Sequence, residues 1–157
     1  MFFETWYTFS MRILLQKVSR ASVTVDGGMI GSIDAGYVLF LGVFGGDTSA
    51  HAQLLAEKIV NLRLWPGSDG KINDRSLLDV GGSLLVISQF TLAGRTEKGN
   101  RPDYTAAAPR DEALVLYRYF IEKCRSLGVS RVEEGEFGAS MSVELCNEGP
   151  VTLVLEK

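Results

Sequence analysis

The chain has 157 residues, the length of one ordinary domain, and it can bury a hydrophobic core. Its 46% hydrophobic and 22% charged residues are typical of a globular protein and exclude a disordered chain. The formal net charge of -3 argues against a protein that grips long stretches of phosphate backbone, because such a surface needs clustered Lys and Arg. If the substrate is a nucleic acid, we therefore expect a small contact at one end of it.

Residues 1–10 are interpreted as an N-terminal extension that precedes a domain over residues 11–157. The segment is crowded with aromatic residues but lacks the Lys or Arg of a signal or transit peptide. No later apolar run reaches transmembrane length without a charge or a glycine pair, so we expect no membrane partner. Cys124 and Cys146 match neither a zinc-binding pattern nor a disulfide framework. We expect no metal site, a buried Cys124 on the apolar side of a helix and a reducing, cytoplasmic location.

The N-terminal part of the domain is expected to form strands. Residues 12–18 indicate a buried strand, and two further runs flank Asp26-Gly27-Gly28, a hairpin signal because Asp and Gly tolerate positive φ. Residues 37–44 are another apolar run of strand length, which ends at a glycine pair. The two runs beside the hairpin signal are residues 22–25 and 29–33.

Two main helices follow. Residues 47–49 suit the start of a helix over residues 49–64, which Trp65-Pro66-Gly67 ends. Its apolar stripe is predicted at Leu54, Leu55, Ile59 and Leu62. A strand over residues 83–92 leads into a basic loop, and Pro109 suits the first position of a second helix that Gly128 closes. With alternating residues 141–145 and 151–155 as further strand segments, we predict a single α+β domain with a largely antiparallel, barrel-like sheet.

Ordinary hydrolase machinery is hard to assemble from this sequence. His51 is the only histidine, and its place at the start of the first helix favours a half-buried helix residue over a catalytic base. The sequence contains no nucleophile elbow, no phosphate-binding glycine fingerprint and no zinc-protease motif. We therefore expect neither ordinary side-chain nucleophilic catalysis nor a metal or cofactor.

The first candidate site is Ser88-Gln89-Phe90-Thr91-Leu92, where an apolar strand becomes polar as it enters the basic loop. A strand end displays hydroxyls, an amide and the following backbone N–H groups at one edge, and these are the donors that an oxyanion needs. A strand that simply leaves the core is the alternative interpretation.

The second candidate site is Asn147-Glu148-Gly149-Pro150-Val151-Thr152. Gly before Pro is unrestricted, and X–Pro bonds are the peptide bonds that most readily become cis. A cis Gly149–Pro150 bond would turn two carbonyls the same way and stiffen them. An ordinary turn explains the same dipeptide.

Taken together, the chain from Met11 to Lys157 resembles the D-aminoacyl-tRNA deacylase family. The matching stretches are residues 16–23, 70–73, 88–92, 101–102, 137–141 and 147–152. The resemblance implies a homodimer with active sites at the subunit interface, where Ser88, Gln89, Phe90 and Thr91 of one subunit face a cis Gly149–Pro150 of the other. It also implies substrate-binding roles for Phe137, Ala139, Met141 and Asn147. Where this chain has Lys17, the family usually has an Arg, whose guanidinium braces the Gly-Pro loop. Lys cannot form the same bidentate contact, so Lys17 would have to brace the loop differently.

The implied reaction is hydrolysis of the ester between a D-amino acid and the 3′ end of tRNA, including glycyl-tRNA(Ala). Backbone N–H groups around Phe90 and Thr91 would hold the oxyanion, and the 2′-hydroxyl of the terminal adenosine would activate the water. Thr91 as a covalent nucleophile is the rival mechanism, but it lacks a visible base. Two other functions stay open: editing of L-alanyl-tRNA(Thr), and a non-catalytic nucleic-acid-associated module. Arg95, Lys98 and Arg101 are either a local attraction for the tRNA phosphates or a solvated loop.

Overall fold

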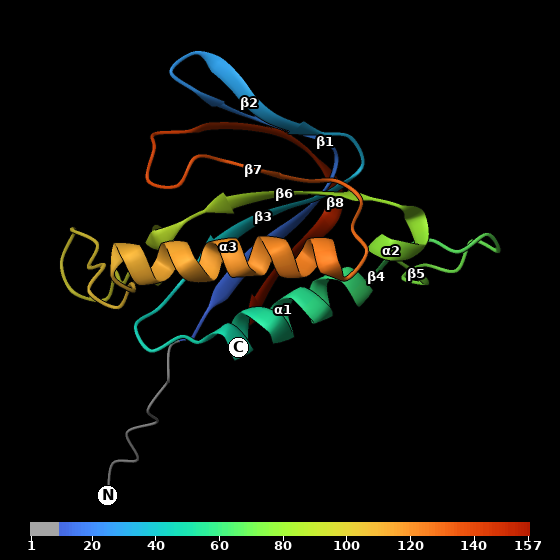
Figure 1. Cartoon of the computed structure of the whole chain (residues 1–157). Coiled ribbons are helices and arrows are strands. Elements are labelled where there is room, and N and C mark those ends of the chain that lie inside the picture. Colours follow the sequence, from blue (N-terminus) through green and yellow to red (C-terminus); the bar gives the residue numbers. More distant parts are fainter. Residues whose placement is uncertain (1–9) are drawn as a thin grey trace, which may run out of the picture.

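The computed structural model describes residues 10–157, which fold as one α+β unit (Figure 1). The strands are β1 (Arg12–Val25), β2 (Gly28–Ile33), β3 (Gly36–Gly42), β4 (Arg63–Trp65), β5 (Arg75–Ser76), β6 (Ser83–Ser88), β7 (Val132–Glu134) and β8 (Ser142–Glu156). The helices are α1 (Ser49–Asn61), α2 (Leu77–Val80) and α3 (Arg110–Ser126), with a 3-10 turn, η1 (Phe90–Ala93). The interpretation of residues 1–10 as an extension falls, except for Ser10, outside the described residues.

The long strand β1 organises the main sheet. Its two halves pair with β3 and β2 on one side, its whole length pairs with β8 on the other, and all three pairings are antiparallel. β6 adds to β3, and β7 adds to β6, as parallel strands. The expected largely antiparallel, barrel-like sheet in a single α+β domain is confirmed, with the parallel pairings confined to the β6 side.

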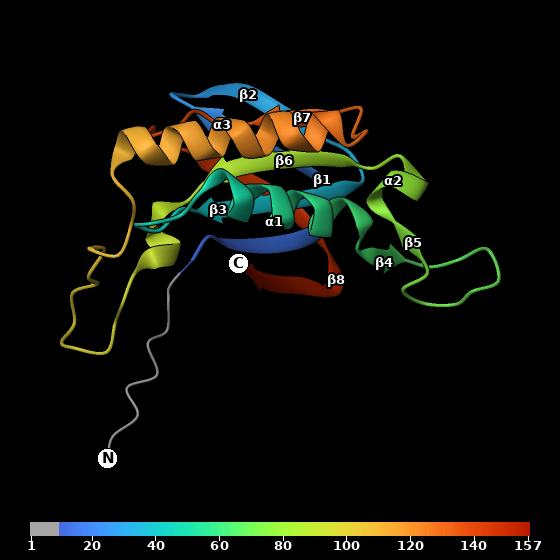
Figure 2. The same cartoon turned by 60° about the horizontal axis from the view of Figure 1, so that its bottom comes forward.

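Two hydrophobic cores lie on the two faces of this curved sheet. Helices α1 and α3 cover one face, and the larger core lies between them and the sheet (Figures 1 and 2). The smaller core fills the inside of the curl and includes Val18, Val38, Leu85 and Ile87. Buried Cys124 of α3 belongs to the larger core, as predicted, and its burial raises the pKa of the thiol to about 12. No helix among residues 10–157 is long and apolar enough to cross a membrane.

Helix α1 is shorter than its sequence predicts. It ends at Asn61, and Arg63–Trp65 forms strand β4 against β5 instead of continuing the helix. Leu54 is 49% exposed, so its place in the apolar stripe was wrong. The stripe follows Ala52, Leu55, Ala56, Ile59 and Val60, which recur at helical spacing on the side that faces the core. The early end of α1 lets the Trp65 ring pack on Tyr37 of β3, with 4.9 Å between the ring centroids.

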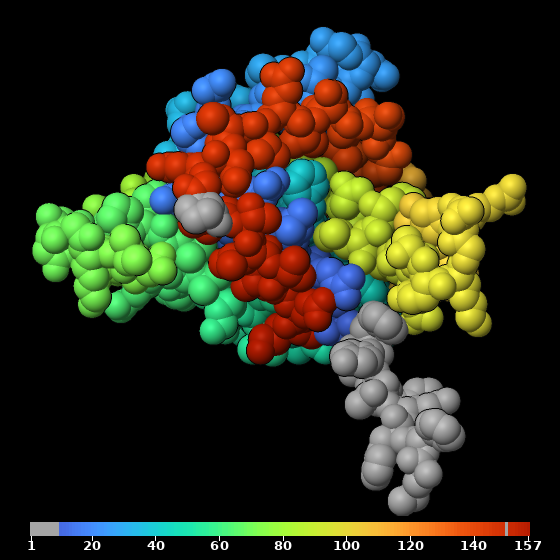
Figure 3. All heavy atoms as spheres, turned by 180° about the vertical axis from the view of Figure 1, so that it is seen from behind, coloured from blue at the N-terminus to red at the C-terminus, as the bar shows by residue number. Residues whose placement is uncertain are grey.

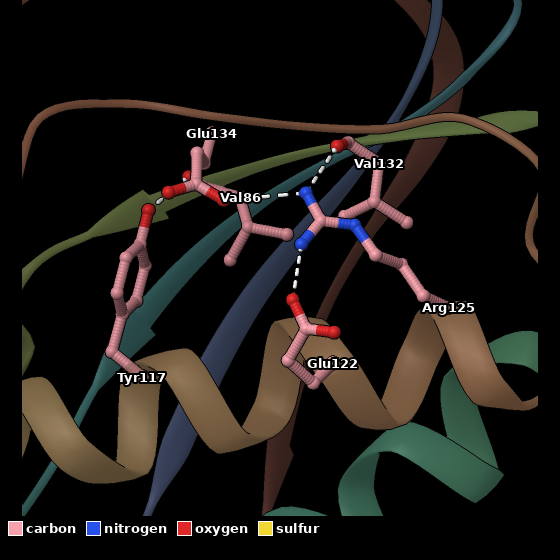
Figure 4. Close-up of polar contacts among 6 residues, drawn as sticks. All are labelled: Val86, Tyr117, Glu122, Arg125, Val132 and Glu134. Carbon is pink, nitrogen blue, oxygen red and sulfur yellow. Dashed lines mark hydrogen bonds and ion pairs between the residues drawn. The ribbon is translucent and has the colours of Figure 1, made fainter.

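Helix α3 is tied to the strands beside it by two side chains (Figure 4). The buried Tyr117 hydroxyl donates a hydrogen bond to the Val86 carbonyl of β6 at 2.8 Å. Near the end of the helix, the Arg125 guanidinium donates to the Val132 carbonyl of β7 at 3.1 Å and contacts Glu134 at 3.4 Å. These contacts fix α3 relative to β6 and β7, the two strands that lead into the site described next.

Candidate active site at the end of strand β6

A cavity of about 490 Å³ opens where β6 ends, a size within the usual range of about 300–1,000 Å³ for ligand sites. Four segments far apart in the sequence line it: the end of β3, the end of β6 with the start of η1, the start of α3 with the residues before it, and the connection from β7 into β8. The lining includes six residues that the sequence analysis named as candidates: Ser88, Gln89, Phe90, Phe137, Ala139 and Met141. The structure therefore brings Ser88, Gln89 and Phe90 together with three of the implied substrate-binding residues, whereas Thr91 and Asn147 do not line the cavity.

The strand does not run to Leu92 as the sequence predicts. The last backbone bond to β3 is the Gln89 N–H donating to the Leu41 carbonyl at 2.8 Å, and the chain then turns into η1. The first N–H groups of a helical turn have no partner inside it. Accordingly, the Phe90 and Thr91 amides donate to no other group among residues 10–157. Two neighbouring amide donors are therefore free for a ligand, as an oxyanion hole requires.

The position of η1 depends on a close approach at Gly42, the last residue of β3. A Cβ atom at Gly42 would lie 2.9 Å from Leu92 Cβ and 3.0 Å from the Gln89 carbonyl oxygen. From the other side, the Arg12 guanidinium donates to the Leu92 carbonyl at 2.9 Å. The turn that carries the free amides is thus held between β3 and β1 with no room for an added methyl group.

Thr91 has no basic partner within the described part of the chain. Its hydroxyl contacts the side-chain amide of Gln89, which is neutral whichever way its oxygen and nitrogen are placed. A neutral amide cannot take up the proton of the hydroxyl at physiological pH. Phe90 is 57% exposed at the cavity edge and packs edge-on against Tyr104, with 5.3 Å between the ring centroids. Its exposed ring is therefore accessible to a ligand at the cavity edge.

The second candidate stretch forms a bulge in β8. Asn147 lies opposite Val18 and Thr152 lies opposite Gln16, so residues 148–151 stand opposite Lys17 alone. The Asn147 side-chain amide spans this bulge, donating to the Lys17 carbonyl at 2.9 Å and to the Val151 carbonyl at 3.2 Å. The first bond ties the start of the bulge to β1, and the second joins the two ends of the bulge within β8.

The described side chains of the bulge do not reach the cavity of their own chain. Gly149 is exposed, and a Cβ atom there would meet only the Asn147 side-chain oxygen, at 3.9 Å. Neither Gly149 nor Asn147 lines the cavity. The side chain of Pro150 lies outside the part of the chain that the structure describes.

Lys17 is 6% exposed and turns its ammonium away from solvent, toward Trp65. The Nζ atom lies 5.0 Å from the centroid of the Trp65 ring, which also packs on Tyr37. The backbone of Lys17 holds the bulge through Asn147, whereas its side chain holds the adjacent aromatic pair. From the sequence, Trp65 was predicted only to end a helix, and nothing in the local pattern around it indicates the contact with Lys17.

The remaining candidates lie away from the cavity. His51 is half-buried at the start of α1, where its Nδ1 atom accepts a hydrogen bond from the Thr48 N–H at 3.2 Å, which confirms its interpretation as a helix residue. Arg95, Lys98 and Arg101 are exposed on the loop after η1, and Arg95 pairs its backbone with Asp103. Residues 10–157 contain no group of three His, Cys, Asp or Glu side chains that could hold a metal ion.

The chain is similar to known proteins over nearly its whole length. A family model described as D-Tyr-tRNA(Tyr) deacylase matches residues 14–156. The D-aminoacyl-tRNA deacylase of Thermomicrobium roseum is 54% identical over 146 residues, covering 93% of this chain and 94% of the relative. That of Thermus aquaticus is 52% identical over 146 residues, covering 93% and 95%.

Two solved structures share the fold. One, described as c-Myc DNA Unwinding Element Binding Protein, has a TM-score of 0.87 at 38% identity and covers 93% of this chain and 98% of its own. The other, a probable eukaryotic D-amino acid tRNA deacylase, has a TM-score of 0.81 at 17% identity, covering 94% and 99%. The family match and these relatives extend over nearly the whole chain, and on this basis it belongs to the D-Tyr-tRNA(Tyr) deacylase family.

Proposed function

We propose that the protein hydrolyses the ester that links a D-amino acid to the 3′-terminal adenosine of tRNA. The observation that carries this proposal is the pair of free amides at Phe90, which lines a cavity of about 490 Å³, and at Thr91, the residue after it. Fixed backbone donors stabilise the negative charge that develops on the carbonyl oxygen in the transition state. The family of the chain and the names of its relatives support the same substrate class.

In the proposed reaction, a water oxygen attacks the ester carbonyl, and the resulting oxyanion binds the two amides. The bond to the ribose oxygen then breaks, releasing the D-amino acid and the tRNA with its hydroxyl protonated. The 2′-hydroxyl of the adenosine orients the water and relays its proton, because the described cavity lining offers no His, Asp, Glu or Lys for that role.

The Thr91→Ala variant should retain most of its deacylation activity. The reason is that Thr91 contacts only a neutral amide, and a hydroxyl needs an adjacent base or a lowered pKa to act as a nucleophile. Single-turnover hydrolysis of D-tyrosyl-tRNA would measure the rate. Complete loss of activity in a folded variant would revive the covalent mechanism.

We further propose a homodimer in which the Gly149–Pro150 bond is cis and acts as the chirality filter of the partner's cavity. Gly149 is exposed, and among the described residues neither it nor Asn147 lines the cavity of its own chain, which supports a role toward a second copy. β8 runs along the face turned away from the helices, with β1 beside it (Figure 3), and exposes Val154 at 61%. In the filter, rigid carbonyls beside the substrate Cα leave room for hydrogen alone and reject an L side chain.

The experiment that tests this function compares four substrates: D-tyrosyl-tRNA, L-tyrosyl-tRNA, glycyl-tRNA and L-alanyl-tRNA(Thr). Analytical ultracentrifugation determines the oligomeric state. We expect the D-tyrosyl ester to be hydrolysed and the L-tyrosyl ester to be hydrolysed only slowly. Glycyl-tRNA, including glycyl-tRNA(Ala), should also be hydrolysed, because glycine has no side chain for the filter to reject. Sparing of glycyl-tRNA would contradict steric rejection. A preference for L-alanyl-tRNA(Thr) would indicate the related editing function, and no hydrolysis at all would indicate a non-catalytic module.

The same proposal includes the domain that carries the activity, its place in the cell and the residues that attract the tRNA. Residues 11–157 constitute the catalytic domain, and the protein works in the cytoplasm, where aminoacylated tRNA is the substrate. Exposed Arg95, Lys98 and Arg101 on the loop after η1 attract the acceptor end of the tRNA. Their confinement to one loop agrees with a chain of net charge -3 that holds only one end of the nucleic acid.

A further inference from the structure

Arg110, the first residue of α3, lies at the lip of the cavity and is not one of the residues that the sequence singled out. Its guanidinium stacks on Phe137, with 5.6 Å from Cζ to the ring centroid. It also lies against the backbone of Gly138, where a Cβ atom would come within 2.8 Å of Arg110 Cζ. Both neighbours line the cavity together with Arg110. The guanidinium is therefore held in place by a flat ring and a bare backbone rather than by a carboxylate.

The charge of Arg110 is not neutralised by a partner. It takes part in none of the ion pairs formed among residues 10–157. Glu134 and Glu136 line a neighbouring hollow with Arg110, beyond ion-pair distance, and Glu134 already contacts Arg125. Asp111 and Glu112, the next residues of α3, likewise form no ion pair with it.

The position of the cation runs against the local electrostatics. A helix N-terminus carries a partial positive charge, which disfavours a cation in the first turn and favours an anion. Pro109, the N-cap of α3, forms no side-chain capping bond, so the first amides of the 17-residue helix add to the positive potential at this lip, which the carboxylates of Asp111 and Glu112 in the same turn offset in part. A bound anion would relieve this unfavourable arrangement.

We propose that Arg110 binds the phosphate that joins the last two nucleotides of the substrate tRNA. This inference rests on the proposed function, which places the ester beside the Phe90 and Thr91 amides, and it adds that the terminal adenosine enters the cavity. The phosphates are the anionic groups of an aminoacylated 3′ end, and the one attached to the terminal adenosine leaves the cavity at its lip. A planar, pre-positioned guanidinium suits bidentate contact with phosphate oxygens.

The test compares Arg110→Gln with the unmodified chain on two D-tyrosyl esters, one of full-length tRNA and one of adenosine without any phosphate. We expect kcat/KM on the tRNA ester to fall by about 10- to 100-fold, mainly through KM, because a charge-assisted contact is lost. The rate on the adenosine ester should change less than about twofold, since that substrate has no phosphate for Arg110 to bind. Arg63→Gln removes the same charge from the exposed first residue of β4, which does not line the cavity, and serves as the matched control.

Salt dependence provides an independent readout. The slope of log kcat/KM against log salt concentration on the tRNA ester should become shallower by about 0.7 in Arg110→Gln, as expected for one lost contact to a single strand. Equal losses on both esters would overturn the proposal and assign Arg110 to the cavity wall. An unchanged rate on both would overturn it as well. If the unmodified chain cleaves neither ester, the proposed function itself fails, which is a separate outcome.

Discussion

The Gly42→Ala variant should fold but lose at least about 100-fold in deacylation activity. A methyl group at residue 42 would meet Leu92 Cβ at 2.9 Å and the Gln89 carbonyl at 3.0 Å, so η1 has to move away from β3. That movement displaces the Phe90 and Thr91 amides. A misplacement of about 1 Å, or loss of one oxyanion donor, costs a catalyst about 100-fold.

The fold itself should tolerate this change. Gly42 is not in the left-handed region of φ, so alanine can adopt its backbone conformation, and the overpacking should cost about 1–3 kcal/mol of unfolding free energy. Gly45→Ala is the matched control, because a Cβ atom there meets only the Ala106 carbonyl, at 4.0 Å. Single-turnover rates and thermal melts of both variants would measure the two effects. Near-normal activity of Gly42→Ala would show that η1 does not hold the reacting carbonyl.

The sequence predicted the location of the active site better than its local geometry. The change from apolar to polar residues at Ser88 marked the strand end that lines the cavity. The turn at Phe90 was missed, because it is set by the Gln89 bond to the Leu41 carbonyl and by the bare backbone of Gly42. Both partners lie in a different strand, so no pattern within residues 83–92 reports them.

The break at residues 147–150 was predicted as an interruption between two strand segments. In the structure it is a bulge within one long strand, because β1 pairs with both halves of β8 and keeps them in line. The contact of Lys17 with Trp65 and the stacking of Arg110 on Phe137 also join segments distant in the sequence. Such tertiary contacts have no local signature, and they decide how the site is held.

The Asn147→Asp variant tests how the bulge is held. The substitution preserves the shape of the side chain but removes the two N–H bonds to the Lys17 and Val151 carbonyls, and it brings a negative charge near both oxygens. Because the proposed filter works through rigidity, a loosened bulge should admit L side chains. Two hydrogen bonds of about 1 kcal/mol each correspond to a decrease of about 30-fold in the ratio of D-tyrosyl- to L-tyrosyl-tRNA hydrolysis.

This decrease should come mainly from faster hydrolysis of the L ester, since the amides at Phe90 and Thr91 lie outside the bulge and are not altered. Asn61→Asp makes the same chemical change on α1, where the side-chain amide donates to the Glu57 carbonyl at 2.8 Å, and should leave the ratio unchanged. A slower reaction on both esters with a constant ratio would assign Asn147 to stability alone. Faster hydrolysis of the L-tyrosyl ester in Asn147→Asp, together with an unchanged ratio of D to L hydrolysis in Asn61→Asp, would mean that the hydrogen bonds of Asn147 across the bulge keep the reaction stereoselective.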